Sequence, residues 1–420
     1  MPPAAGARRS RSSPQPLEYN VLLTATLCLL AFGAVMVYSA SSARTLLQGQ
    51  GDGTTYLVRY VGYGLVGLVA MRFVARRPLD WLMRFTAPLL AVSFVGLLAV
   101  KLPGIGVEVN GARRWLGAGP VQFQPSEIAK LALVLYSAQV LAVRPGKWRT
   151  PKQLTPLMLV TGLAILLVAA EPDLGTALVI TFTLSSLLTA AGVPLRWIAT
   201  GFAIGLFLVA LYALTASYRR ARLTSFMDPW AHAGTTGFQA VQGQIAIGSG
   251  GLFGRGLGQS VQKIFFLPEA HTDFILAIIG EELGVAGVFG VVFLYGLVAY
   301  SGLRIARRAA GAYAKLLAAG LTSIVLCQAL LNIFVVLGMA PLTGVPLPFV
   351  SYGSTNLVVL LVGVGLLLNV ASGGTVKLRA VSGGRDPSRS ARHGSDDPDR
   401  RRRHGGARGA RAGGRRRAAG

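Results

Sequence analysis

Ten stretches of this 420-residue chain are apolar for about 20 residues each, and this repeated length constrains the fold more than any other feature. A helix rises 1.5 Å per residue, so about 20 apolar residues cross the hydrocarbon core of a bilayer. The composition agrees, because only 14% of the residues are charged, whereas a soluble domain carries about a quarter. The sequence therefore predicts an all-α polytopic membrane protein with ten transmembrane helices. The predicted spans are residues 20–39, 56–74, 82–101, 126–143, 154–170, 174–191, 197–216, 273–300, 314–338 and 355–372.

Basic residues alternate between successive connecting segments, and this alternation sets the expected orientation. The segments "RRPLDWLMR", "RPGKWRTPK", "GVPLRW" and "RIARRAAGAYAK" are basic, whereas "EPD" and "MAPLTGVPLPFVSYG" contain no Lys or Arg. Short cytoplasmic loops carry the excess of Lys and Arg. We therefore expect both termini in the cytoplasm and a large extracytoplasmic loop between the seventh and eighth spans. The segments expected outside are 102–125, 171–173, 217–272 and 339–354.

The two ends of the chain differ in composition from the apolar middle. We expect a disordered cytoplasmic leader over 1–19, a transmembrane domain over 20–372 and a disordered basic cytoplasmic tail over 373–420. Much of the net charge of +25 lies in that tail, which has almost no apolar content. Beside a membrane, its expected partner is anionic lipid of the inner leaflet or an acidic protein. No nucleic acid is needed to explain the charge.

The long outer loop contains "IAIGSGGLFGRGLGQS", which we expect to be too rich in glycine for a regular helix. Non-helical backbone near membrane depth persists only where protein covers it or where it lines a wet cavity. The functional site is therefore expected on the outer face of the membrane.

Carboxylates lie at the start of the eighth span, where hydrocarbon would be a poor solvent for them. Asp273 is expected at the outer boundary, with Glu281 about 12 Å further along the helix axis on the same face. Acids within membranes are costly and usually functional, so Asp273 is the candidate catalytic group at the mouth of a cavity. The alternative is that Asp273 only caps the helix. For Glu281 and its neighbour Glu282, internal ion pairing or packing is favoured over chemistry. Among the histidines, His271 lies near these acids.

Other polar residues are candidates for organising the same cavity. Glu127 and Lys130 are three residues apart and so lie on one helix face, where they would first neutralise each other. As an alternative, the pair lines the cavity and sets the protonation of Asp273. Asp173 lies at a tight outer turn in "EPDLGT", where acids at a helix start are stabilising without further function.

Several cations fall on the expected outer side. Taken singly, each is explained as an interfacial anchor. Together they suit an anionic, phosphate-bearing ligand. The candidates are Arg113 and Arg114 in "NGARRWLG", Arg219 and Arg222 in "SYRRARL", and Lys263. The sequence has no phosphate-binding P-loop, no Cys/His cluster at metal-ligand spacing and no nucleophile elbow.

Six motifs in fixed order carry a resemblance to a known family. They are "NGARRWL", "FQPSEIAKL", "EPDLGTA", "QAVQGQIAIGSGGLFGRGLGQS", "LPEAHTDFILAIIGEELG" and "PLPFVSYG". The chain resembles the SEDS family of bacterial peptidoglycan polymerases from about residue 20 to 372, and most of all its division branch, FtsW, rather than its elongation branch, RodA. One departure is Ser354, which stands where the family usually has a second glycine.

The resemblance implies a membrane-bound inverting glycosyltransferase that uses lipid II, the undecaprenyl-pyrophosphate disaccharide-pentapeptide. It implies that Asp273 is the catalytic residue, and we expect it to act as a general base. The leaving pyrophosphate would be received by the cations named above, and His271 would also bind the substrate, while Glu127, Lys130, Asp173 and Glu281 organise the cavity. No cofactor is required, although a divalent cation such as Mg²⁺ or Mn²⁺ could assist.

The resemblance also implies partners and a place in the cell. A class B penicillin-binding transpeptidase and other division proteins are the expected partners, at the septum of the bacterial cytoplasmic membrane. Two rival functions remain at this stage. A lipid II flippase would explain intramembrane charges equally well, and a non-catalytic division scaffold would explain the basic tail.

Overall fold

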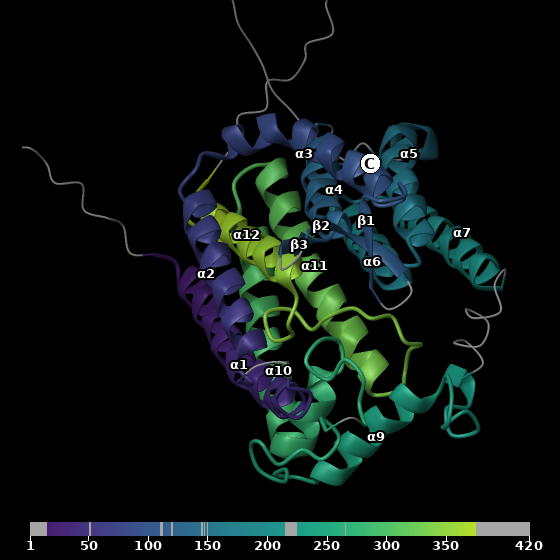
Figure 1. Cartoon of the computed structure of the whole chain (residues 1–420). Coiled ribbons are helices and arrows are strands. Elements are labelled where there is room, and N and C mark those ends of the chain that lie inside the picture. The colour runs from purple at the N-terminus through teal and green to yellow at the C-terminus, as the bar shows by residue number, and fades with distance from the viewer. Residues whose placement is uncertain are drawn as a thin grey trace, which may run out of the picture. The chain divides into compact units, whose positions relative to one another are not determined.

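The computed structural model describes residues 15–49, 52–109, 112–118, 121–143, 146, 148, 150–214, 225–264 and 266–374 (Figure 1). The chain divides into two units, Met1–Leu378 and Arg379–Gly420. All the described residues belong to the first unit, and only that unit is discussed below.

A helix coincides with each of the ten segments expected to span the membrane. Seven of these helices are long and apolar enough to cross a bilayer, judged by length and composition over the described residues. They are α1 (Leu17–Leu47), α2 (Thr55–Ala75), α3 (Leu79–Ala99), α5 (Pro151–Ala170), α10 (Ile275–Arg308), α11 (Ala312–Val336) and α12 (Ser354–Ala371). The others are α4 (Pro125–Ala142), α6 (Leu174–Ala190) and α7 (Leu195–Leu214). The chain is therefore a mainly helical, polytopic membrane protein.

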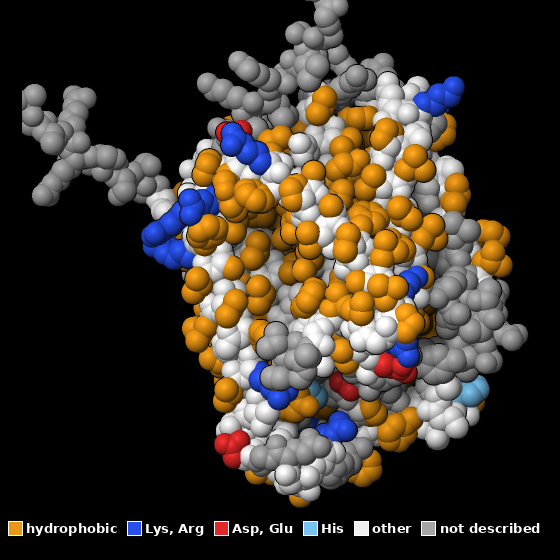
Figure 2. Space-filling model, turned by 45° about the horizontal axis from the view of Figure 1, so that its top comes forward, with side chains coloured by type: hydrophobic (Ala, Val, Ile, Leu, Met, Phe, Trp, Pro, Cys, Tyr) orange, Lys and Arg blue, Asp and Glu red, His pale blue; other side chains and the backbone are white. Residues whose placement is uncertain are grey.

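The surface is consistent with a lipid environment. Figure 2 shows a face on which apolar side chains form a broad belt, with most Lys, Arg, Asp and Glu side chains towards its margins. Inside the unit, α1 packs against α10, α2 against α12, α3 against α4, and α6 against α11. Most residues of α4, α11 and α12 are buried, whereas few residues of α2 and α3 are. Glu127 and Lys130 of α4, and Gln328 and Asn332 of α11, therefore lie in the protein interior, away from lipid.

The expectation of an all-α fold is wrong in one segment. Strands β1 (Gly106–Val109), β2 (Ala112–Ala118) and β3 (Val121–Phe123) form an antiparallel sheet in the order β1-β2-β3. Trp115 pairs with Val107, and Leu116 pairs with Phe123. The sequence held the signal, because an Asn-Gly dipeptide between short strands is typical of a hairpin turn.

The expectation that the glycine-rich motif is non-helical is also wrong for its first part. Helix α9 (Phe238–Gly250) includes "IAIGSG" and packs against α10. A Cβ on Gly243 would lie 2.6 Å from the Phe274 ring, and one on Gly250 would lie 1.9 Å from the carbonyl oxygen of Gly280. The glycines thus permit close packing of two helices, which offsets their low helix propensity.

Helix α10 is interrupted at Gly284, whose φ of 68° and ψ of −163° are not helical. The segment after α9 covers this break. The N–H groups of Arg255 and Gly256 donate to the carbonyl oxygens of Glu281 and Glu282, and those of Val285 and Ala286 donate to Gly251 and Leu252. The freed backbone groups therefore find partners within the protein, as non-helical backbone in a membrane protein requires.

The break separates two parts of α10 with different surroundings. Residues 275–282 are all buried, and the part after Gly284 exposes apolar side chains, with Phe289 67% exposed and Phe293 64% exposed. The acids of the first part are thus enclosed by protein. Helix α10 begins at Ile275, and its N-cap residue Phe274 makes no side-chain capping hydrogen bond, so the capping alternative for Asp273 stays a prediction from the sequence.

Candidate functional site

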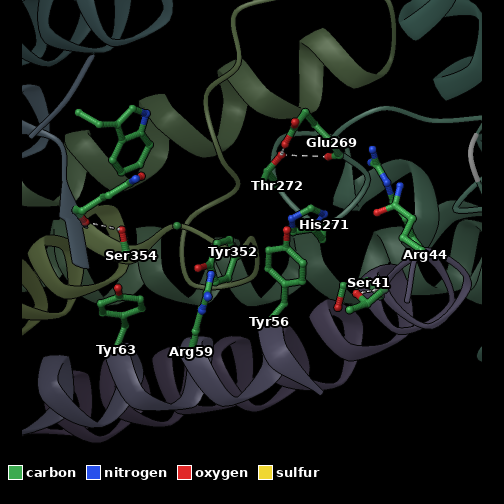
Figure 3. Close-up of a pocket in the computed structure, with 15 residues that line it drawn as sticks. Ser41, Arg44, Tyr56, Arg59, Tyr63, Glu269, His271, Thr272, Tyr352 and Ser354 are labelled. Atoms are coloured by element: carbon green, nitrogen blue, oxygen red, sulfur yellow. Dashed lines mark hydrogen bonds between the residues drawn. The ribbon is translucent and has the colours of Figure 1, made fainter. Parts of the chain in front are cut away.

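A pocket of about 720 Å³ opens where the end of α1 and the start of α2 meet three other segments (Figure 3). These are the antiparallel pair of strands β2 and β3, the turn before α10 and the turn before α12. In Figure 3, α1 and α2 form one wall, and Tyr56 and Arg59 point from α2 towards His271 and Tyr352. The lining is polar and aromatic, and it includes Ser41, Arg44, Tyr56, Arg59, Tyr63, Trp115, Gln122, Glu269, His271, Thr272, Tyr352 and Ser354.

His271 lies in an aromatic group on this wall. Its ring centroid is 4.3 Å from that of Tyr56 and 5.8 Å from that of Tyr352, and the Tyr352 N–H donates to the His271 carbonyl oxygen at 3.0 Å. Burial lowers the pKa of His271 to about 4, with a further lowering by the charge of Arg44, although Glu269 acts in the opposite direction. The imidazole is therefore neutral at pH 7 and can accept or donate a hydrogen bond, but it brings no positive charge to the pocket.

The positive charges of the pocket are Arg44 and Arg59, and the sequence analysis missed both. Arg44 is in the last turn of α1 and Arg59 is in the second turn of α2. Burial raises the pKa of the Tyr352 hydroxyl, while its hydrogen bond with Arg59 and the charge of that guanidinium act to lower it. A signal was present, because an arginine one turn inside an apolar span is costly unless something in the protein or a ligand needs it.

Asp273 lies in the turn that leads into α10, next to the pocket wall. The Thr272 hydroxyl lies 3.2 Å from Asp273 Oδ1 and 3.0 Å from Glu269 Oε2, and its one hydrogen can be donated to either carboxylate. The side-chain amide of Asn332 on α11 donates to the main-chain oxygen of Asp273 at 2.7 Å. The side chain of Asp273 is half-buried, and the residues lining the pocket end at its neighbour, Thr272. The turn that carries Asp273 is thus tied to α11 through its main chain, and its carboxylate contacts Thr272, the neighbouring residue that lines the pocket.

The two neighbouring arginines of β2 have different surroundings. Arg113 is exposed and pairs with Glu108 at 3.2 Å, away from the pocket. Arg114 donates to the main-chain oxygens of Glu171 and Pro172 and lies 3.9 Å from Asp173 Oδ1. The expected direct role of Arg113 in ligand binding therefore has no support in its position, and Arg114 ties the sheet to the turn between α5 and α6.

Asp173 organises that turn. Its Oδ1 accepts from the Thr176 N–H as the N-cap of α6, and its Oδ2 accepts from the Gln124 amide at 2.8 Å. Nearby Glu171 is buried, and its carboxyl oxygens have no hydrogen-bond partner among the described residues. Burial first, and then the charge of Asp173, raises the pKa of Glu171 to about 8. Glu171 is consequently a neutral acid at pH 7.

Lys263 does not have the position expected of a ligand-binding cation. Its ammonium is buried, lies 2.8 Å from Glu282 Oε1 and donates to the main-chain oxygen of Gly258 at 2.8 Å. Glu281, which is fully buried, accepts hydrogen bonds from the Ser260 hydroxyl and from the N–H of Val261. The prediction of ion pairing and packing for Glu281 and Glu282 is confirmed. Through these contacts, Glu281 and Glu282 bind residues 260–263 of the outer loop to α10.

Glu127 and Lys130 form the internal ion pair expected from their spacing. Lys130 Nζ is 2.7 Å from Glu127 Oε2 and donates to the Gln328 side-chain oxygen on α11 at 2.9 Å. The Gln328 amide in turn donates to the Pro346 carbonyl oxygen and to Asn356. This chain of contacts joins α4 and α11 to the segment before α12, which also carries Tyr352.

The remaining candidates are two arginines of the outer loop and a divalent metal ion. Arg219 and Arg222 lie outside the described residues. Among the residues that the structure describes, no three His, Cys, Asp or Glu side chains form a group able to hold a metal ion. Assistance by Mg²⁺ or Mn²⁺ therefore remains a prediction from the sequence, and no step proposed below uses a metal.

Comparisons with known proteins place these features in a family context. A family model for FtsW, RodA and SpoVE, described as "Cell cycle protein", matches residues 20–375. The chain is 38% identical over 358 residues to a protein of Geobacter sp. (strain M18) named "Probable peptidoglycan glycosyltransferase FtsW", covering 84% of this chain and 96% of that protein. It is also 38% identical over 352 residues to stage V sporulation protein E of Bacillus subtilis (strain 168), with 84% and 96% covered.

A solved structure shows the same fold. One chain of a structure titled "Structural coordination of polymerization and crosslinking by a peptidoglycan synthase complex" matches with a TM-score of 0.69 and 30% sequence identity. The match covers 83% of this chain and 96% of that chain. The likeness therefore extends over nearly the whole of the described unit.

Proposed function

The chain belongs to the FtsW/RodA/SpoVE family of cell cycle proteins, and we propose that the pocket beside His271 binds the lipid-linked substrate of its reaction. The chain is a peptidoglycan glycosyltransferase, as its curated relatives are named. The substrate proposed is lipid II. The observation that carries the proposal is that Arg44, Arg59 and His271 line one pocket that ends one residue from Asp273.

The proposed topology has ten membrane-spanning helices and both termini in the cytoplasm. The alternation of basic segments supports it, as does a helix at each of the ten predicted positions. In this orientation the ends of α1 and α2 that line the pocket face outwards. A substrate anchored by an undecaprenyl chain would then present its pyrophosphate and sugars at the lipid–water boundary, beside the pocket.

The reaction proposed is a single displacement with inversion. Asp273 removes the proton from the 4-hydroxyl of the incoming sugar, whose oxygen attacks the anomeric carbon of the growing glycan. The bond from that carbon to the pyrophosphate breaks, and the departing charge is received by Arg44 and Arg59. His271, being neutral, offers a hydrogen bond and an aromatic face to a sugar without competing for the diphosphate.

Several buried contacts would keep Asp273 and the pocket residues in fixed positions relative to one another. The Thr272 and Asn332 hydrogen bonds fix the turn that carries Asp273, and Glu281 and Glu282 fix the loop that precedes it. The pair of Glu127 and Lys130 supports the turn on the other side of the pocket through Gln328. A general base must be held within hydrogen-bond reach of its proton, so this rigidity supports the role of Asp273.

The partners and place in the cell are proposals of the same kind. The matched chain comes from a complex that, by its title, coordinates polymerization and crosslinking, which supports a class B penicillin-binding transpeptidase as partner. Other division proteins, and anionic lipid at the basic tail, are further proposed partners. The proposed location is the division septum of the cytoplasmic membrane, and the sporulation relative makes a sporulation septum the second candidate.

The proposal is tested with purified full-length protein and fluorescent lipid II. Wild type is expected to produce a ladder of glycan chains, and Asp273→Ala and Asp273→Asn are expected to produce none. The matched control is Asp52→Ala, which removes an exposed carboxylate from the outer loop between α1 and α2. Equal melting temperatures would show that the variants are folded. A ladder from Asp273→Ala at the wild-type rate would overturn the base assignment, and translocation of lipid II without polymerisation would favour a flippase.

A further inference from the structure

A second cavity, of about 660 Å³, lies between α3, α4 and α5 and shares no residue with the pocket beside His271. Its walls are mainly apolar, with Leu90 and Phe94 from α3 and Leu163 from α5 among the lining side chains. Leu163 is 53% exposed. The cavity is therefore a groove on the surface that faces lipid, and the proposed catalytic groups take no part in it.

Two polar side chains of α4 line this otherwise apolar groove. They are Tyr136 and Gln139, and both are half-buried. Among the described residues, neither the Tyr136 hydroxyl nor the Gln139 amide has a hydrogen-bond partner. In a bilayer no water is at hand to satisfy them, so an unmet phenol and amide would cost free energy. A ligand with hydrogen-bond acceptors within an apolar body would remove that cost.

Two basic residues lie at one end of the groove on the helix faces that line it. Arg84 precedes the lining residues Ala87, Ala91 and Phe94 at helical spacing on α3. On α5, Lys152 lies eight residues before Val160, close to two helical turns and so on the same face. Both basic residues are exposed, and neither pairs with an acidic side chain of the residues that the structure describes. The groove thus combines basic residues on α3 and α5 with hydrogen-bond donors on α4 and an otherwise apolar wall.

We propose that this groove binds one anionic phospholipid of the inner leaflet. The proposal rests on the topology proposed above, in which α3 and α5 begin, and α4 ends, at the cytoplasmic face. Arg84 and Lys152 then contact the phosphate headgroup, Tyr136 and Gln139 donate to the ester carbonyl oxygens, and an acyl chain packs against Phe94. An apolar transmembrane helix of a partner would satisfy its own backbone internally and would leave these donors and cations without a match, so an amphiphile with an anionic head fits better.

The test is native mass spectrometry of the full-length protein in detergent, with dioleoyl phosphatidylglycerol or dioleoyl phosphatidylcholine added. The wild type is expected to retain one phosphatidylglycerol more tightly than phosphatidylcholine. Arg84→Gln should weaken the retention of phosphatidylglycerol about fivefold, the effect of one basic residue beside an anionic surface, and leave phosphatidylcholine unchanged. Ala91→Trp, which fills the groove from an exposed position, should remove the bound lipid.

Matched controls separate the groove from the general surface. Arg196→Gln removes another exposed arginine of the proposed cytoplasmic side, and Leu159→Trp enlarges a residue of α5 that is 68% exposed and outside the groove. Both should bind lipid as wild type does. Equal retention of the two lipids by wild type, or unchanged retention in Ala91→Trp, would overturn the proposal. The proposal would also be overturned if Ala91→Trp lost a transpeptidase that co-purifies with the wild type but kept its bound lipid. The experiment measures the mass of bound lipid and not polymerase activity. A failure of the lipid-binding proposal can therefore be told apart from a failure of the proposed polymerase mechanism.

Discussion

The ammonium of Lys263 lies 2.8 Å from Glu282 Oε1, with 4% of the lysine side chain and none of the glutamate side chain exposed. The Ser39 hydroxyl of α1 donates to the same carboxylate at 2.7 Å. One buried pair therefore joins α1, α10 and the outer loop that leads to Asp273. The role of Glu282 inside this apolar helix is therefore to bind Lys263 and so hold the outer loop against α10.

Breaking this pair on one side is expected to destabilise the protein strongly. Lys263→Met leaves Glu282 as a buried charge without its counter-ion, and such changes cost about 3–5 kcal/mol. The double variant Lys263→Met/Glu282→Gln removes both charges and should recover most of that loss. The measurement is thermal melting in detergent, analysed as a double-mutant cycle.

The control for this cycle is the exposed pair of Arg113 and Glu108, in which 53% of each side chain is exposed. Arg113→Met should cost less than about 1 kcal/mol, because exposed ion pairs contribute little. A cycle in which Lys263→Met melts like Arg113→Met would contradict the anchoring role.

The crossing of the outer loop over the break in α10 should tolerate no side chain at Gly254. This glycine has a φ of +80°, and a Cβ there would lie 2.1 Å from the carbonyl oxygen of Glu282. Gly254→Ala is expected to lower the melting temperature and the polymerase rate together, since the clash is with backbone. Gly258→Ala is the control, because Gly258 has nearly the same φ of +81° but open space around its Cβ position. Only the strain of the backbone, about 1–2 kcal/mol, should then appear. Equal effects of the two variants would mean that the close approach is unimportant.

Substrate use should depend on Arg59 and not on Arg113. Arg59→Ala removes a cation from the pocket, and the loss of a hydrogen bond to a charged group, about 1.5–3 kcal/mol, predicts a fall in kcat/KM of about tenfold to a hundredfold. Arg59→Lys keeps the charge but not the planar guanidinium, so its kcat/KM should lie between those of Arg59→Ala and wild type. Arg113→Ala, which removes an exposed side chain that does not line the pocket, should react as wild type does. Initial rates over a range of lipid II concentrations distinguish these outcomes, and a normal kcat/KM in Arg59→Ala would exclude the pocket as the diphosphate site.

Stability should fall with rising pH because of Glu171. Its pKa is raised from an ordinary 4.5 to about 8, so the fold favours the neutral acid. The stabilisation is complete below about pH 4.5 and is lost as the pH rises through 8. Glu171→Gln cannot ionise, and its advantage in melting temperature over wild type should grow between pH 5 and pH 8. Arg114 holds the main-chain oxygen of this residue, which the substitution keeps. If the difference in melting temperature between Glu171→Gln and wild type is the same at pH 5 and pH 8, the carboxyl of Glu171 is already ionised in the folded protein at pH 5.

Much of the fold could be predicted because its signals are local. The length of an apolar stretch places a helix, and a helix is found at all ten predicted positions. Glu127 and Lys130 meet because residues three apart share a helix face, whatever surrounds them. A wrong expectation arose where tertiary packing overrides a local signal. Glycine has a low intrinsic helix propensity, so the sequence does not predict α9, but close packing on α10 offsets that propensity.

The candidate site shows the same division. From the sequence alone came the positions of the helices, the internal pairing of Glu127 with Lys130, and the turn where His271 and Asp273 lie together. Only the tertiary structure decided which cations face that turn, bringing Arg44 and Arg59 from the first two helices and withdrawing Lys263 into a buried pair. The reason is physical: a helix face is set by neighbours within a few residues, whereas a pocket is made by segments more than 200 residues apart whose meeting depends on how all the helices pack.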